Sequence, residues 1–141
     1  MITILGQVPS KSNGYRIANN RMFKSIELKS YEASFEWQIK KHLKENESVE
    51  VPFQIWIEVY FQSNRSDLDN SAKVILDCLQ TSGVIKNDRL CQVLVMRKHI
   101  DKENPRIEFE IKAISKEILT LNKKSNEHHA LTAINIPQGF H

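Results

Sequence analysis

The stretch VPFQIWIEVYF, residues 51–61, constrains the fold of this chain more than any other. From residue 53 onward every second side chain is a large apolar one: Phe53, Ile55, Ile57, Val59 and Phe61. Successive side chains of a strand point to opposite faces, so this period predicts a β-strand with one face in the core. The chain is therefore expected to be built around a sheet.

Weaker periodicities elsewhere predict the order β-α-β-α-β-β. Further strands are expected within residues 1–7, 90–98 and 106–114, and helices over residues 30–46 and 70–80. Ser30 is a suitable cap for the first helix, whose apolar residues recur every four positions, and Gly83 is a suitable stop after the second. We predict the α+β class, with a mixed β-sheet and two main helices packed on it.

The length of 141 residues, 40% of them hydrophobic, fits one globular domain with a modest core. We expect this domain to span residues 1–114, followed by a C-terminal extension over 115–141 that begins with a short helix and ends in a polar tail. No apolar stretch approaches the roughly 18 residues that span a bilayer, so no membrane contact and a cytoplasmic location are expected. Cys78 and Cys91 form no CxxC pair and are expected as buried free thiols.

The N-terminal third is basic. Residues 1–45 carry eight Lys and Arg against four Glu. The polar segment 8–21, VPSKSNGYRIANNR, has the composition of a loop and holds Lys11, Arg16 and Arg21. Such a segment is compatible with binding a polyanion, although scattered solvating side chains explain the same charge.

Two carboxylates lie two residues apart in SNRSDLDNSAK, residues 63–73. In an extended segment the side chains of Asp67 and Asp69 point to the same side, with Cα atoms about 7 Å apart. At 4 Å and an effective dielectric constant near 20, two like charges repel by about 4 kcal/mol. Such a pair takes up a proton or recruits a cation.

A third acid, Asp88, lies in the loop before the strand predicted at 90–98. If that strand is a neighbour of residues 53–61, Asp88 is expected at the same edge of the sheet as Asp67 and Asp69. Three carboxylates suit a hard cation, Mg2+ or Mn2+, and such a site fits phosphoryl chemistry. Lys73, four residues after Asp69, would lie beside the acids and contact a phosphate.

A purely structural interpretation of the same residues stays open on spacing alone. Asp69 is a good helix N-cap, Asp67 suits a turn, and Asp88 with Arg89 resembles an ordinary loop pair.

The combination is more specific than its parts. Residues 65–98, RSDLDNSAKVILDCLQTSGVIKNDRLCQVLVMRK, resemble the central motif of the RusA family of Holliday junction resolvases. The residues that carry the likeness are Arg65, Asp67, Asp69, Asn70, Lys73, Gly83, Val84 and Asp88. The early VPSKSNGYR is similar to the Pro-Ser-x-Asn loop of that family. The resemblance covers about residues 1–114; residues 115–141 have no counterpart in it.

The resemblance implies a RusA-like endodeoxyribonuclease that resolves four-way DNA junctions by paired symmetric nicks in recombination and repair. It also implies a homodimer, dependence on Mg2+ with Mn2+ as a substitute, and an origin that is often a phage or prophage. Asp67, Asp69 and Asp88 would be the catalytic metal ligands, and Lys73 a catalytic residue near the phosphate. Contacts to DNA are expected from the polar and basic residues Lys11, Asn13, Arg16, Arg21, Arg65 and Lys73.

Two other functions are compatible with parts of this sequence. A non-catalytic, structure-selective DNA-binding protein could use the same scaffold with its acids retained as caps, and a divalent-metal titration separates it from a nuclease. A nucleotide-sugar transferase with a DxD motif is disfavoured, because the chain has no glycine-rich phosphate loop and little room for a nucleotide domain.

Overall fold

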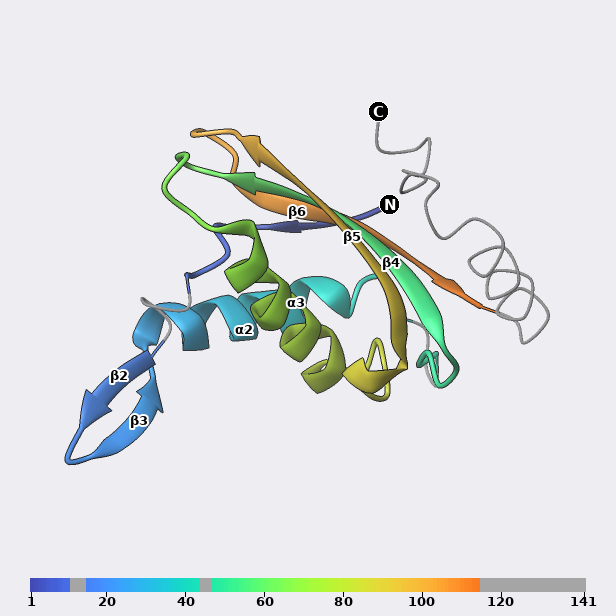
Figure 1. Cartoon of the computed structure of the whole chain (residues 1–141), viewed down its shortest axis with the longest axis horizontal. Helices are drawn as coiled ribbons and strands as arrows, with labels where there is room; N and C mark the ends of the chain where they lie inside the picture. Colours follow the sequence, from blue (N-terminus) through green and yellow to red (C-terminus); the bar gives the residue numbers. More distant parts are fainter. Residues whose placement is uncertain (11–14, 44–46, 115–141) are drawn as a thin grey trace, which may run out of the picture.

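The computed structural model describes residues 1–10, 15–43 and 47–114. Two helices, α2 (Ile26–Ile39) and α3 (Leu68–Thr81), lie on one side of a four-stranded sheet (Figure 1). The sheet consists of β1 (Ile2–Leu5), β4 (Phe53–Phe61), β5 (Cys91–Ile100) and β6 (Arg106–Ala113). A hairpin of β2 (Tyr15–Ala18) and β3 (Arg21–Lys24) projects from the body, and a short 3-10 helix, η1 (Asp88–Leu90), precedes β5. None of the helices in the described part of the chain has the length and apolar content needed to cross a bilayer.

The sheet is mixed, as predicted. Its strand order is β1-β6-β4-β5, with β6 antiparallel to both β1 and β4, and β5 parallel to β4. The parallel register pairs Phe53 with Cys91 and Phe61 with Ile100, and α3 makes the crossover between the two strands. Among the described strands β5 has a neighbour on one side only, so it forms an edge of the sheet.

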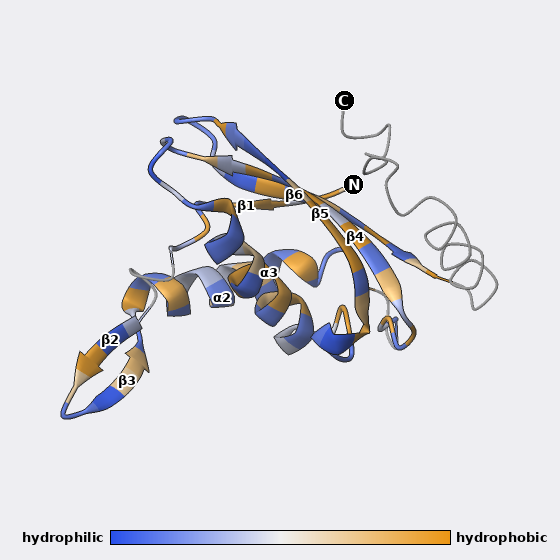
Figure 2. Cartoon of the chain, viewed as in Figure 1, coloured by the Kyte–Doolittle hydropathy of each residue, from blue (hydrophilic) through white to orange (hydrophobic). Residues whose placement is uncertain are grey.

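The core lies between the helices and one face of the sheet. The five apolar side chains of β4 singled out by their period are all at most 1% exposed, which confirms the predicted inward face. Removing such a side chain from water contributes about 1.5–3 kcal/mol. They pack with buried residues of both helices, among them Phe35, Ile39, Ile75 and Leu79. Figure 2 shows the resulting alternation of polar and apolar residues along these elements.

Helix α2 begins earlier than predicted. Its N-cap is the buried Ser25, whose hydroxyl accepts a hydrogen bond from the Leu28 amide at 3.2 Å, and not Ser30. Ser30 is an exposed residue inside the helix. Leu28 extends the buried face of α2 by one turn toward the N-terminus. The four-residue period that starts at Tyr31 does not include Leu28, so it did not predict this first turn.

Helix α3 begins at Leu68 and has Asp67, not Asp69, at its N-cap position. Asp69 lies inside the first turn. At the other end Gly83 has φ +84° and follows the C-cap residue Ser82, which confirms the predicted stop, because this left-handed conformation favours glycine.

The segment predicted as a loop, residues 8–21, instead contains β2 and the turn into β3. Asn19 and Asn20 connect the two strands with φ of 52° and 61°. Positive φ at both central residues is the geometry of a type I′ hairpin turn, and asparagine tolerates it. At the base of the hairpin, Lys24 donates a hydrogen bond to Glu32 of α2 at 3.0 Å.

Candidate active site

Asp67 and Asp69 are exposed at the N-terminal end of α3, and Asn70 contacts both carboxylates. The Asn70 side-chain amide donates to Asp67 Oδ2 at 3.3 Å, and its backbone amide donates to Asp69 Oδ1 at 2.9 Å. The positive end of the helix dipole favours negative charge here. The structure thus places two carboxylates together at a helix start where water and a ligand have access to them.

Asp88 lies at the other end of α3. It precedes Cys91, which pairs with Phe53 at the start of β4, whereas Asp67 follows the end of that strand. Its backbone amide donates to Gln80 Oε1 at 2.9 Å. Gln80 stands eleven residues after Asp69 along the helix, about 16 Å at 1.5 Å per residue.

The expectation that Asp88 arrives at the same sheet edge as Asp67 and Asp69 is therefore wrong for a single chain. When two neighbouring strands are parallel, the loop that leads into the second strand lies at the end of the sheet where the first strand starts. Within the described ranges no three His, Cys, Asp or Glu side chains are grouped so as to hold a metal ion. The metal-binding and catalytic roles of the three aspartates remain predictions.

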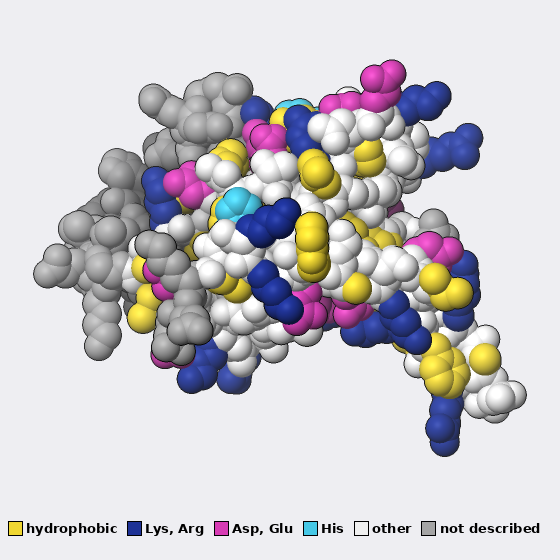
Figure 3. Space-filling view, turned by 180° about the vertical axis from the view of Figure 1, so that it is seen from behind, with side chains coloured by type: hydrophobic (Ala, Val, Ile, Leu, Met, Phe, Trp, Pro, Cys, Tyr) yellow, Lys and Arg dark blue, Asp and Glu magenta, His cyan; other side chains and the backbone are white. Residues whose placement is uncertain are grey.

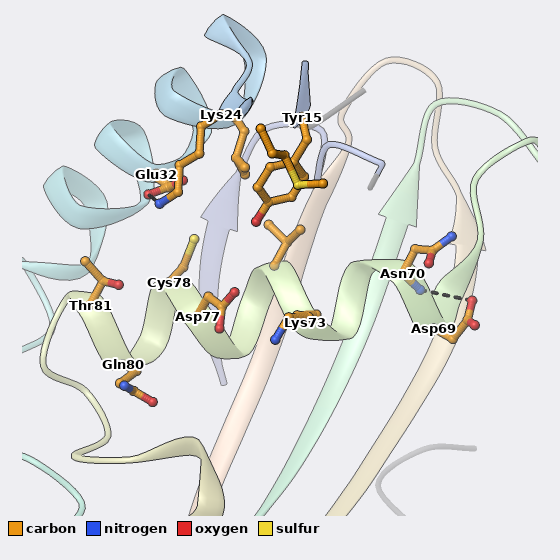
Figure 4. Close-up of a pocket in the computed structure, with 13 residues that line it drawn as sticks. Tyr15, Lys24, Glu32, Asp69, Asn70, Lys73, Asp77, Cys78, Gln80 and Thr81 are labelled. Carbon is orange, nitrogen blue, oxygen red and sulfur yellow. Dashed lines mark hydrogen bonds and ion pairs between the residues drawn. The ribbon is translucent and has the colours of Figure 1, made fainter. Parts of the chain in front are cut away.

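Lys73 lies one turn after Asp69 and is exposed. It lines a pocket of about 690 Å3 that α3, α2 and the β2–β3 hairpin enclose (Figure 4). Asp69 and Asn70 line the same pocket at its α3 end. Lys73 and Asp69 thus border the same pocket, whereas Asp67 does not line it; the contact of Lys73 with a phosphate remains a prediction.

Lys98 is a residue that the sequence analysis missed. Its ammonium group donates to the carbonyl oxygens of Ser66 at 2.6 Å and Asn64 at 3.1 Å, and so ties the turn before Asp67 to β5. Lys98 also lines a groove of about 560 Å3 together with Asp67, Asp69, Leu94 and Met96. The position of Lys98 follows from the pairing of β5 with β4. The register sets Lys98 opposite Val59, so both side chains lie on the helix side of the sheet.

The basic residues predicted to contact DNA lie on two elements. Arg65 is exposed in the turn before α3, and Arg16 and Arg21 are exposed on the hairpin. Figure 3 shows this hairpin as an arm that carries basic and hydrophobic side chains. Lys11 and Asn13 fall outside the described residues, as does the extension 115–141 with its expected short helix.

The two cysteines are free thiols. Cys78 is buried, as expected, and burial raises its pKa to about 12. Cys91 is only partly buried, against the expectation, and burial again raises its pKa. Both thiols are therefore protonated at neutral pH and are poor nucleophiles.

Comparison with known proteins adds two findings. Residues 6–112 match the family model described as Endodeoxyribonuclease RusA. The Crossover junction endodeoxyribonuclease RusA of Aquifex aeolicus (strain VF5) is 30% identical over 94 residues, which are 65% of this chain and 74% of that protein. The family match includes both ends of α3, and with them Asp67, Asp69, Lys73 and Asp88.

Proposed function

The chain belongs to the RusA family of endodeoxyribonucleases, and from this premise we propose that it resolves four-way DNA junctions by paired nicks that require a divalent cation. The observation that carries this proposal is the exposed aspartate pair at the start of α3, beside Lys73. These residues stand where the family motif has its acidic pair and its lysine.

The donor chemistry of the pair suits a hard cation. Asp67 and Asp69 offer only carboxylate oxygens, which are preferred ligands of Mg2+ and Mn2+. Such a cation, when bound, offsets the charge of the scissile phosphate and lowers the pKa of a coordinated water. Lys73 binds the same phosphate from the next turn of α3, and Arg65 and the hairpin arginines bind flanking phosphates.

The position of Asp88 leads us to propose a shared site in a homodimer. Strand β5 is the outer strand of the described sheet. Near its C-terminal end Lys98 bonds the turn before Asp67, whereas Asp88 lies just before its N-terminal end. If two copies of β5 pair antiparallel about a two-fold axis, each strand start lies beside the end of its neighbour. This brings the partner subunit's Asp88 toward Asp67 and Asp69.

Two further features support this pairing. Leu94, 41% exposed, and Met96 point from β5 into the groove that Asp67 and Asp69 border, so an apolar surface adjoins the strand edge. Among the described strands β5 is also an outer strand of the sheet, and such strands are common sites of pairing with a second chain. The resulting two-fold dimer holds two equivalent sites, as paired nicks in a nearly symmetric junction require.

The test is incubation of the full chain with a synthetic four-way junction, with and without Mg2+, beside a linear duplex of the same arm sequence. We expect symmetric nicks in the junction only, and only with the cation. A chain that leaves the junction intact in both Mg2+ and Mn2+ contradicts the proposed activity.

One observation favours a second candidate, the non-catalytic DNA-binding protein. The three aspartates do not meet within the described part of one chain. Titration with Mn2+, followed by its electron paramagnetic resonance signal, distinguishes the two. The nuclease binds the ion through Asp67 and Asp69, which weakens the sharp signal of free aqueous Mn2+, and it loses this binding in Asp69→Asn. A binding module leaves the signal of the free ion equally strong with both proteins.

A further inference from the structure

The pocket beside Lys73 has two unlike walls. One is the polar face of α3, with Asn70, Lys73 and Asp77; the other is formed in part by Tyr15 and Met22 of the hairpin. Figure 4 shows the Tyr15 ring entering from the hairpin side and Asp77 from the helix side. A volume of about 690 Å3 lies within the usual range for small-molecule ligands.

The register of the hairpin assigns each side chain to one of two faces. Tyr15 pairs with Lys24 and Ile17 with Met22, and directly opposed residues point to the same side of a two-stranded ribbon. Tyr15, Met22 and Lys24 all line the pocket, so Ile17 lies on the pocket face as well. Arg16 and Phe23 lie on the other face.

Apart from Lys24 at its base, the pocket face of the hairpin carries apolar and aromatic side chains, two of which are open to solvent. Ile17 is 77% exposed and Met22 is 69% exposed. Exposed apolar side chains of this size, grouped on a projecting element, mark a surface that meets a partner. The hairpin, residues 15–24, also carries three basic residues and no acidic one, so its charge is complementary to DNA.

We propose that this pocket receives a nucleobase unstacked from the branch point of a four-way junction. The inference rests on the proposed function and deepens it by giving the same site a means of recognising a branch. Tyr15 and Met22 form an aromatic and apolar wall for the base, as in other proteins that bind single-stranded bases, and Ile17 lies on the same face of the hairpin.

Distances along α3 agree with this occupant. Asp77 stands one turn after Lys73, about 5–6 Å away between Cβ atoms. A nucleotide whose phosphate contacts Lys73 therefore has its base within reach of Asp77, a carboxylate acceptor suited to the exocyclic amino group of a base. Bases of an intact duplex are paired and stacked, and extracting one costs free energy that a branch point lowers.

The test uses junctions that carry 2-aminopurine at the branch point, without divalent cation so that no strand is cut. Its fluorescence rises when the base unstacks. The variant Ile17→Ser/Met22→Ser alters the pocket face, and Phe23→Ser, at a residue 49% exposed on the same strand as Met22, alters the opposite face and serves as the matched control.

We expect the fluorescence to rise with the wild-type chain and with Phe23→Ser, and to stay low with the double variant. The preference for junction over duplex should fall about 5- to 100-fold in the double variant only, since stacking of one base accounts for factors of this size. Equal fluorescence and equal junction preference in the two variants overturn the inference. A change in sedimentation that only the double variant shows also overturns it, because the pocket face of the hairpin would then contact a second copy of the chain. If the wild-type chain cuts junctions in Mg2+ but causes no rise in fluorescence without it, the proposed role of the pocket is wrong and the proposed nuclease activity is unaffected.

Discussion

At the scale of single residues, the aspartate pair shows how one motif combines structure with chemistry. Asp67 occupies the N-cap position of α3 without making a side-chain capping bond, and Asp69 lies in the first turn. Both carboxylates contact Asn70. If Asp67 served only as a cap, its carboxylate would accept a bond from a backbone amide of the first turn. The two side chains are thus held in place and remain open to solvent.

Asp69→Asn should lower junction cleavage at least about a hundredfold, because it replaces an anionic ligand by a neutral amide. Junction binding should stay equal or become tighter, since one charge that repels phosphates is removed. Loss of the favourable interaction with the helix dipole costs about 0.3–1 kcal/mol of stability. Cleavage in Mg2+, gel shift without Mg2+ and thermal unfolding check the three parts, and undiminished cleavage contradicts the assignment.

Lys73→Ala should reduce cleavage about 10²- to 10³-fold, the usual effect of losing one group that stabilises developing charge. The side chain is exposed, so the free energy of unfolding should change by no more than about 0.5 kcal/mol. Lys40→Ala, at an exposed lysine next to the end of α2, is the control and should cut at the wild-type rate. Unfolding of Lys73→Ala at a clearly lower temperature would instead make this lysine structural.

At the scale of elements, the sequence predicted best where a period is strict. Every second residue of β4 is buried, and this alternation predicted both the strand, within residues 51–61, and its inward face. The start of α2 was missed because Ser25 and Ser30 are both possible caps, and only the burial of Leu28 distinguishes them. The hairpin was missed because its turn is Asn19-Asn20 and not the familiar Asn-Gly, in a segment rich in polar residues.

The turn between β5 and β6 makes the stability depend on pH. Arg106 donates a hydrogen bond to Asp101 at 2.9 Å, and this bond lowers the pKa of Asp101 below its usual 3.8. A depressed carboxyl pKa stabilises the fold above the unfolded-state value and loses that effect as the pH falls through the folded-state value. Asp101→Asn should therefore unfold at lower urea than the wild type at pH 7, and the gap should narrow below about pH 3.8. A gap that stays constant down to pH 3 contradicts this account.

At the scale of the whole molecule, strand direction decides which residues meet. Periodicity predicts strands and their inward faces but does not say whether two neighbours run parallel. Because β4 and β5 are parallel, α3 separates Asp88 from Asp67 and Asp69. The motif therefore proposes the members of the candidate site, whose roles remain predictions, but it does not give their arrangement in space.

A mixture of two inactive variants tests the shared site. Asp69→Asn and Asp88→Asn should each be inactive alone, while a mixed dimer keeps one complete site, formed by Asp67 and Asp69 of the Asp88→Asn chain and Asp88 of the other. Random exchange gives about half mixed dimers with one site each, so about a quarter of the wild-type activity should return, as single nicks. Sites contained within one chain regain nothing on mixing. Asp69→Asn mixed with Asp67→Asn is the control and stays inactive under either arrangement.

The separation of Asp88 from Asp69 by the length of α3 also affects how the cleavage rate depends on protein concentration. If neither copy holds a complete set of acids, a lone chain is harmless to DNA, and cutting begins only when two chains meet. At concentrations well below the dissociation constant of the pair, the rate of strand scission then rises with the square of the amount of protein. Under that condition, cleavage would be confined to places where the protein is concentrated enough for two chains to pair.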